Sequence, residues 1–65
     1  MKIIINGKSR KVGVKTLEEL MVFLKYDPEK VILSVNGQLV EKDEYAKTTL
    51  SDGDNLEVFS FVGGG

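Results

Sequence analysis

The sequence contains no cysteine and no histidine, and both absences limit the chemistry that it can perform. Without cysteine there is no disulfide framework, no thiolate nucleophile and no sulfur ligand for a metal. Without histidine the commonest general base and the commonest metal ligand are missing. We therefore expect no catalytic residue, no metal site and no independent enzyme. A short domain without disulfides is typical of a reducing compartment, so we expect a cytoplasmic location.

Neither sign of charge is in excess, because nine Lys and Arg residues stand against ten Asp and Glu residues. Nucleic-acid-binding domains rely on clustered positive charge, so we expect no nucleic-acid partner. No stretch approaches the ~20 apolar residues that cross a bilayer, and the apolar run at the start is too short for a signal peptide. We expect no membrane partner either. The 65 residues, 42% of them hydrophobic, suffice for one small domain with a core.

Alternating apolar residues predict several short strands. We expect strands over residues 1–6, 8–14, 31–36, 38–41 and 55–62. Asn-Gly pairs at 6–7 and 36–37 favour tight hairpin turns, because Asn and Gly tolerate positive φ. Four basic residues, which we call the basic group, lie in the second segment or directly after it: Lys8, Arg10, Lys11 and Lys15. We interpret this group as protection of an edge strand, with a phosphate-binding patch as the alternative.

A helix is predicted between the two strand pairs. Thr16 and Glu19 have the spacing of a capping box. An apolar stripe with helical spacing follows at Leu17, Leu20, Met21 and Leu24. We expect the helix to reach residue 25 or 26 and Pro28 to close it, because proline restricts the residue before it.

The remaining segments read as loops. Residues 42–48 are polar, and we expect an irregular segment or a single turn with Tyr45 half-buried. Asp52 and Asp54 flank a glycine, and we interpret them as turn residues that bind local backbone N–H groups rather than as a metal site. The order hairpin, helix, strand pair, loop, strand predicts an α+β fold. We expect a β-grasp, a mixed sheet of four to five strands packed on one helix, over residues 1–62, with a flexible tail over 63–65.

The glycine tail is the first candidate for function. Gly63, Gly64 and Gly65 have no Cβ atoms, so an extended tail can thread a narrow channel in another protein. A carboxylate on glycine is also unhindered toward attack on ATP. Activation as an acyl-adenylate would make it electrophilic, and a partner enzyme must supply this chemistry. A frayed end without a role is the alternative.

The outer face of the last strand is the second candidate. Phe59 and Phe61 alternate with core residues and point away from them. If the neighbouring strands are the first and the third, Ile4 and Ile32 join the same patch. Clustered aromatic residues on a solvent face favour a partner-binding surface, and a larger core that buries them is the alternative.

These features together resemble the sulfur carrier family of thiamin biosynthesis, ThiS. The resemblance rests on the start Met-Lys-Ile-Ile-Ile-Asn-Gly, Thr-Leu at 16–17, Val-Asn-Gly at 35–37, Leu50 with Asp-Gly-Asp at 52–54, and the terminal Gly-Gly. It covers the whole chain and implies the ubiquitin-like β-grasp.

The resemblance implies a function for the tail. In this family an E1-like enzyme adenylates the C-terminal glycine with ATP, and sulfur drawn from a cysteine desulfurase converts it to a thiocarboxylate. Thiazole synthase then receives the sulfur. Carried over to this sequence, Gly65 bears the reactive carboxylate, Gly64 completes the Gly-Gly pair, and the chain binds no cofactor itself. A molybdopterin-synthase small subunit, a tRNA-thiolation carrier and an interaction module with an inert tail remain alternatives.

Overall fold

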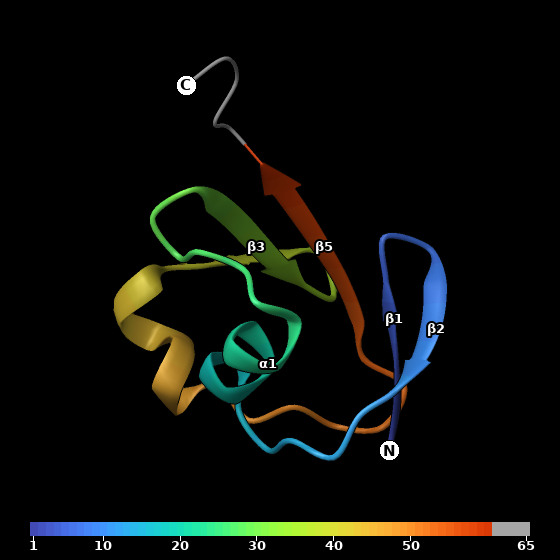
Figure 1. Cartoon of the computed structure of the whole chain (residues 1–65). Helices are drawn as coiled ribbons and strands as arrows, with labels where there is room; N and C mark the ends of the chain where they lie inside the picture. Colours follow the sequence, from blue (N-terminus) through green and yellow to red (C-terminus); the bar gives the residue numbers. More distant parts are fainter. Residues whose placement is uncertain (61–65) are drawn as a thin grey trace.

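The computed structural model describes residues 1–60, which form a five-stranded sheet and two helical segments (Figure 1). The elements in chain order are β1 (Lys2–Ile5), β2 (Lys8–Lys11), α1 (Leu17–Leu24), β3 (Val31–Val35), β4 (Gln38–Val40), the 3₁₀ helix η1 (Lys42–Lys47) and β5 (Asn55–Ser60). The predicted α+β architecture is confirmed. Within residues 1–60, no helix has the length and apolar character needed to cross a bilayer.

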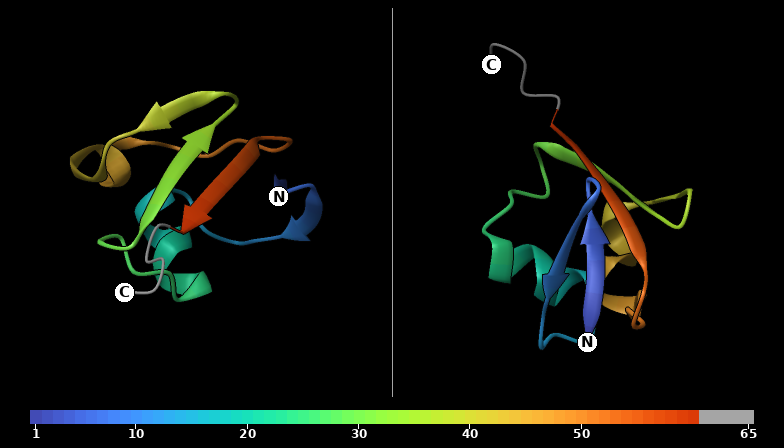
Figure 2. Two further views of the ribbon diagram at one scale, coloured as in Figure 1. Left: turned by 90° about the horizontal axis from the view of Figure 1, so that it is seen from above. Right: turned by 90° about the vertical axis from the view of Figure 1, so that its right-hand side faces the viewer.

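Strand β5 lies at the centre of the sheet. The strand order is β2-β1-β5-β3-β4, with β5 parallel to β1 and antiparallel to β3. Figure 2 shows β5 between β3 and the β1–β2 hairpin. The sheet is therefore mixed, and its first and last strands lie side by side as the β-grasp interpretation predicts.

Both hairpins turn at the predicted Asn-Gly pairs. Asn6 has a φ of 50° and Gly7 a φ of 84°, and Asn36 and Gly37 repeat this geometry at 52° and 86°. Two consecutive residues with positive φ make a type I′ turn, whose twist matches that of the flanking strands. The turns fix the pairing of Ile5 with Lys8 and set the register of the first hairpin.

Helix α1 begins with the predicted capping box. The Thr16 hydroxyl accepts a hydrogen bond from the Glu19 backbone N–H at 3.2 Å, and the Glu19 carboxylate accepts bonds from the backbone N–H groups of Lys15 and Thr16. These backbone bonds stabilise the charged form of Glu19 and lower the pKa of its carboxyl group. The box satisfies helix N–H groups that have no partner within the helix.

The helix ends at Leu24, earlier than predicted. Lys25 takes the left-handed conformation, with a φ of 62°, and the Tyr26 backbone N–H donates to the Met21 carbonyl at 3.0 Å. This reversal closes the last turn before Pro28 is reached. The expectation that Pro28 ends the helix is therefore wrong.

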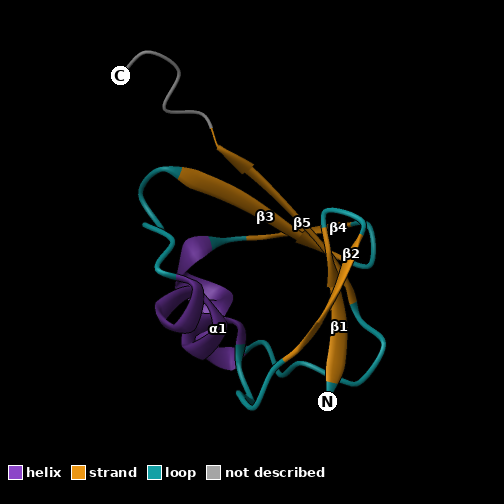
Figure 3. Ribbon diagram, turned by 45° about the vertical axis from the view of Figure 1, so that its right-hand side comes forward, coloured by secondary structure: helices purple, strands orange, loops and turns teal. Residues whose placement is uncertain are grey.

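The core lies between α1 and the inner face of the sheet, and Figure 3 shows α1 on this one side. Its most deeply buried members are Ile3, Leu17, Leu33 and Leu56. Tyr45 of η1 joins them with only 4% of its surface exposed, so it is buried rather than half-buried as predicted. Residues 42–47 form the regular 3₁₀ helix η1 in place of the expected irregular segment or single turn, and this helix packs against α1.

Several predicted strands are shorter in the structure. Strand β2 ends at Lys11, although Val12 is buried and its N–H still donates to the Met1 carbonyl. Strand β3 ends at Val35 because Asn36 already has the positive φ of the turn. The predicted end of the last strand at Val62 and the predicted tail over 63–65 lie outside the described residues.

Candidate functional site

Two candidate binding residues meet on the outer face of the sheet, on the side away from α1. Ile32 of β3 lies directly opposite Phe59 of β5 in the antiparallel register. Phe59 is 53% exposed and Ile32 is 43% exposed. Their alternating neighbours, Leu33 and Leu56, are buried in the core. The alternation predicted from the sequence therefore leaves an apolar pair facing solvent at the centre of the sheet.

The sequence analysis missed a third member of this surface. Leu39 of β4 pairs with Ser34, so it shares the outer face with Ile32, and it is 72% exposed. Diagonal neighbours on adjacent strands lie roughly 7–8 Å apart, within contact range for long side chains. The two-residue turn at 36–37 fixes which residues of β3 and β4 pair. This pairing places Leu39 on the outer face, so the sequence held the signal that identifies it. We call Ile32, Leu39 and Phe59 the outer apolar patch.

Ile4 lies on the same face but is not part of this patch. It pairs with Asn55, at the start of β5, whereas Phe59 lies near the end of the described part of β5. The four intervening steps along a strand span about 13 Å. Glu57 occupies the outer face between them and accepts a hydrogen bond from the Ser34 hydroxyl. Ile4 and Ile32 therefore do not form the continuous surface that we expected.

The two hairpin asparagines hold β5 in place. Strand β1 pairs with β5 only through Leu56, and beyond it the Asn6 side chain takes over. The Val58 N–H donates to Asn6 Oδ1 at 2.9 Å, and Asn6 Nδ2 donates to the Val58 carbonyl at 3.3 Å. At the other end of β5, the Asn55 N–H donates to Asn36 Oδ1 at 2.9 Å. The strand that leads to the tail is thus fixed on both sides.

The carboxylates of the turn before β5 accept hydrogen bonds from other parts of the protein. Asp54 accepts hydrogen bonds from the Ser51 N–H and from the side-chain amide of Asn36, and Asp52 accepts one from the N–H of Lys2 at the start of β1. Only the bond from the Ser51 N–H is the local backbone bond that the turn interpretation expects, because the other two donors are far away in the sequence. Among residues 1–60, no group of three or more Asp and Glu side chains is arranged to hold a metal ion.

Three members of the basic group, Lys8, Arg10 and Lys11, lie on β2 at the edge of the sheet, and Lys15 lies after this strand. All four residues of β2 are exposed, and β1 is the neighbour of β2 in the strand order. The predicted edge position is therefore confirmed, and the charges protect an open strand edge. The remaining candidates, Phe61, Gly63, Gly64 and Gly65, lie outside the described residues.

Comparison with known proteins identifies the family. The model of the ThiS family matches residues 3–65. The chain belongs to the ThiS family. The resemblance found in the sequence is confirmed, and the sequence positions matched by the family model include the glycine tail.

Solved and curated relatives extend this assignment. A crystal structure of a thiamine biosynthesis protein (ThiS) from Geobacter metallireducens is 36% identical, covers both chains completely and superposes with a TM-score of 0.85. The sulfur carrier protein ThiS of Bacillus subtilis is 32% identical over 63 residues, which are 94% of this chain and 96% of that protein. The first likeness confirms the β-grasp fold for this ThiS-family chain.

Some relatives are much longer. A thiazole synthase of Paramagnetospirillum magneticum is 41% identical over 66 residues, which cover all of this chain and 20% of that protein. A thiazole synthase of Magnetococcus marinus shows the same coverage at 38% identity. The chain therefore spans about a fifth of the length of these two relatives. Each of them contains a segment similar to this ThiS-family chain.

Proposed function

We propose that this chain is a sulfur carrier for thiazole formation in thiamin biosynthesis, with the sulfur held on the Gly65 carboxyl group. The observation that carries the proposal is the match of the ThiS family through residue 65. The Bacillus subtilis and Escherichia coli relatives, named sulfur carrier protein ThiS, support it. In this function the chain is a co-substrate of partner enzymes and not an enzyme.

The chemistry at Gly65 takes two steps on a partner enzyme. A carboxylate oxygen attacks the α-phosphorus of ATP, and pyrophosphate leaves. A sulfide-level sulfur nucleophile then attacks the acyl carbon, and AMP leaves with the oxygen that it gained. An E1-like adenylating enzyme would bind the ATP. A cysteine desulfurase would supply the sulfur indirectly, as a persulfide that a thiol reductant brings to the sulfide level while the reductant is oxidised to a disulfide. The product is a thiocarboxylate on the chain.

The thiazole synthase is the acceptor in this proposal. Two thiazole synthases contain a segment similar to this chain, so carrier and synthase occur within one polypeptide in those proteins. Gly63 and Gly64 carry no side chains and would let the end of the chain enter a narrow active site. If the chain also supplied sulfur to a second thiolation pathway, the same thiocarboxylate would react with a different acceptor enzyme.

Intact mass measurement tests the proposal. The chain is incubated with an E1-like enzyme, ATP and sulfide, and the expected result is the mass gain of replacing one oxygen by one sulfur. Addition of the thiazole synthase and its substrates should return the original mass. A matched variant with one alanine added after Gly65 should fold identically and gain no mass. If the wild-type chain gains no mass, the tail is inert and the chain is an interaction module.

The outer apolar patch would dock the activating enzyme. A few side chains, aromatic ones prominent among them, supply most of the binding energy at the centre of an interface. We expect Phe59→Ala to weaken binding by about 2 kcal/mol, roughly thirtyfold in Kd. Because Phe59 is half exposed, the thermal midpoint of the variant should stay nearly unchanged. Ile4→Ala is the control on the same face, and equal losses of affinity in both variants would contradict the assignment of the patch.

A further inference from the structure

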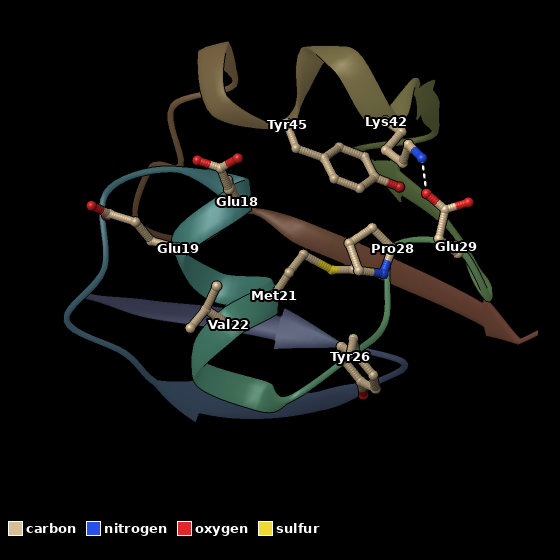
Figure 4. Close-up of a pocket in the computed structure, with 9 residues that line it drawn as sticks. All are labelled: Glu18, Glu19, Met21, Val22, Tyr26, Pro28, Glu29, Lys42 and Tyr45. Carbon is tan, nitrogen blue, oxygen red and sulfur yellow. Dashed lines mark hydrogen bonds and ion pairs between the residues drawn. The ribbon is translucent and has the colours of Figure 1, made fainter.

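A groove lies on the opposite side of the molecule from the outer apolar patch, between α1 and η1. It has a volume of about 630 Å³. Figure 4 shows side chains from α1, from η1 and from the segment that joins α1 to β3 around it. This volume lies within the range of roughly 300–1,000 Å³ that is typical of ligand-binding clefts. The residues that line the groove do not include any member of the outer apolar patch.

The walls of the groove are mainly apolar. Met21, Val22, Tyr26, Pro28 and Tyr45 contribute side chains to it. Val22 is 74% exposed, although it lies in the middle of a helix whose opposite face is buried. Helix α1 therefore presents more apolar surface than the core requires. An exposed apolar surface next to a cleft favours contact with another apolar group.

The neighbour of Val22 strengthens this observation. Phe23, the next residue of α1, is 55% exposed. Two adjacent exposed apolar side chains on a helix point about 100° apart, so together they widen the apolar surface around the helix. The free surface of α1 thus resembles one side of an interface.

The rim of the groove carries mostly negative charge. Glu18 and Glu19 lie at the end near the start of α1, and Glu29 lies at the other end. Among the lining residues that the structure describes, Lys42 is the one basic residue, and it forms an ion pair with Glu29. Glu19 stays ionised because backbone N–H groups bind its carboxylate and lower its pKa. Three carboxylates against one ammonium group leave a negative rim that attracts cations.

The end near Lys42 also offers a polar group. The Tyr45 side chain is 4% exposed, and its hydroxyl oxygen points toward the Lys42–Glu29 pair (Figure 4). Burial raises the pKa of this hydroxyl, so it stays a neutral donor and acceptor at neutral pH. An occupant that reaches this end meets a hydroxyl and a carboxylate side by side.

We propose that this groove binds a short segment of another protein, with a branched aliphatic anchor side chain flanked by Lys or Arg residues. The apolar walls accept the anchor, and the carboxylates of the rim accept the basic flanks. The negative rim disfavours nucleic acids and anionic lipid surfaces, because both would bring further negative charge. The outer apolar patch stays accessible, so the chain can hold this segment while another partner engages the sheet.

A defined probe tests the proposal by NMR. The probe is a synthetic peptide of two leucines with two lysines on each side, titrated into the ¹⁵N-labelled chain. We expect amide shifts at Val22, Tyr26 and Tyr45 and no shifts along β5. A second peptide with serines in place of the leucines and a third with glutamates in place of the lysines should both bind at least about tenfold more weakly, since each lacks one part of the recognition.

Variants of the chain complete the test. Val22→Ser removes the exposed aliphatic side chain and should weaken peptide binding about five- to tenfold. Leu39→Ser is the matched control, because Leu39 has nearly the same exposure as Val22 but lies on the outer apolar patch. The affinity of this variant for the leucine peptide should equal that of the wild-type chain. Glu18→Gln should weaken binding at low salt and have little effect at high salt.

Three results would overturn the proposal. The first is a set of shifts that map to the sheet instead of the groove. The second is equal affinity for the leucine and serine peptides, which would mean nonspecific attraction of charge. The third is the occupation of the groove by a second copy of the chain, whose basic strand β2 is complementary in charge. Analytical sedimentation would establish this last case if it showed dimers of the wild-type chain at the NMR concentration and monomers of Val22→Ser.

Discussion

Replacing Asn6 by glycine should release β5 beyond Leu56 while the first hairpin stays formed. Asn6 adopts a φ of 50°, which glycine adopts without strain, so the turn itself tolerates the change. The variant loses the two hydrogen bonds between the Asn6 amide and the backbone of Val58. No other described strand covers this edge of β5 at Val58, because the pairing with β1 ends at Leu56.

The expected loss of stability follows from these bonds. A net hydrogen bond contributes about 0.5–1.5 kcal/mol, and both bonds of Asn6 are exposed, which places them at the lower end. The greater freedom of glycine in the unfolded chain destabilises the folded state by roughly a further 0.5–1 kcal/mol. The relief of strain at the positive φ partly offsets this loss of stability. We expect a decrease of about 1–2 kcal/mol in the free energy of unfolding. For a domain of this size the urea midpoint should fall by about 1–2 M.

Amide hydrogen exchange locates the effect. In Asn6→Gly, the Val58 amide should exchange much faster, while the Glu57 and Phe59 amides, which face β3, should keep most of their protection. Asn36→Gly is the matched control, because Asn36 has the same conformation and binds the Asn55 N–H instead. In Asn36→Gly, the amide that exchanges faster should be that of Asn55 and not that of Val58. Unchanged protection of Val58 in Asn6→Gly would refute the role of the Asn6 side chain.

The remaining predictions concern the core and the helix cap. Leu20→Ala should lower the free energy of unfolding by about 2–5 kcal/mol, because Leu20 is only 2% exposed and its truncation leaves a cavity. An unchanged denaturation midpoint would contradict the position of Leu20 in the core. Glu19 has a lowered pKa in the folded chain, so its stabilising effect is present above the unfolded pKa of a carboxyl group and is lost as the pH falls through the folded value. Thermal unfolding from pH 7 down to pH 3 should show a smaller loss of stability in Glu19→Gln than in the wild-type chain, and identical curves would exclude this contribution.

Local signals in the sequence predicted the elements well. The Asn-Gly turns and the capping box each depend on residues within four positions, so the sequence contains all the information that they need. The end of α1 was mispredicted because a lysine adopts the left-handed conformation there, which is uncommon for a residue with a Cβ atom. The full burial of Tyr45 was missed because it depends on the packing of η1 against α1, which no local sequence pattern specifies.

The candidate surface was predicted only in part, for a similar reason. Strand alternation correctly placed Ile4, Ile32 and Phe59 on one face, because it depends on position along each strand alone. The distance between Ile4 and Phe59 depends on the register between β1 and β5, which are about fifty residues apart in the sequence. No local pattern fixes that register. Leu39 was missed although the turn beside it fixes its partner.

The central position of β5 has a consequence for the synthesis of the chain. Translation completes β5 after the other four described strands, yet β5 is the strand that joins the β1–β2 hairpin to the β3–β4 hairpin. A polypeptide released from the ribosome before residue 55 would lack the strand that joins the two hairpins, so their apolar sides would stay uncovered. The sheet and its core therefore close only when residues 55–60 have been made, because the fully buried Leu56 belongs to this last strand.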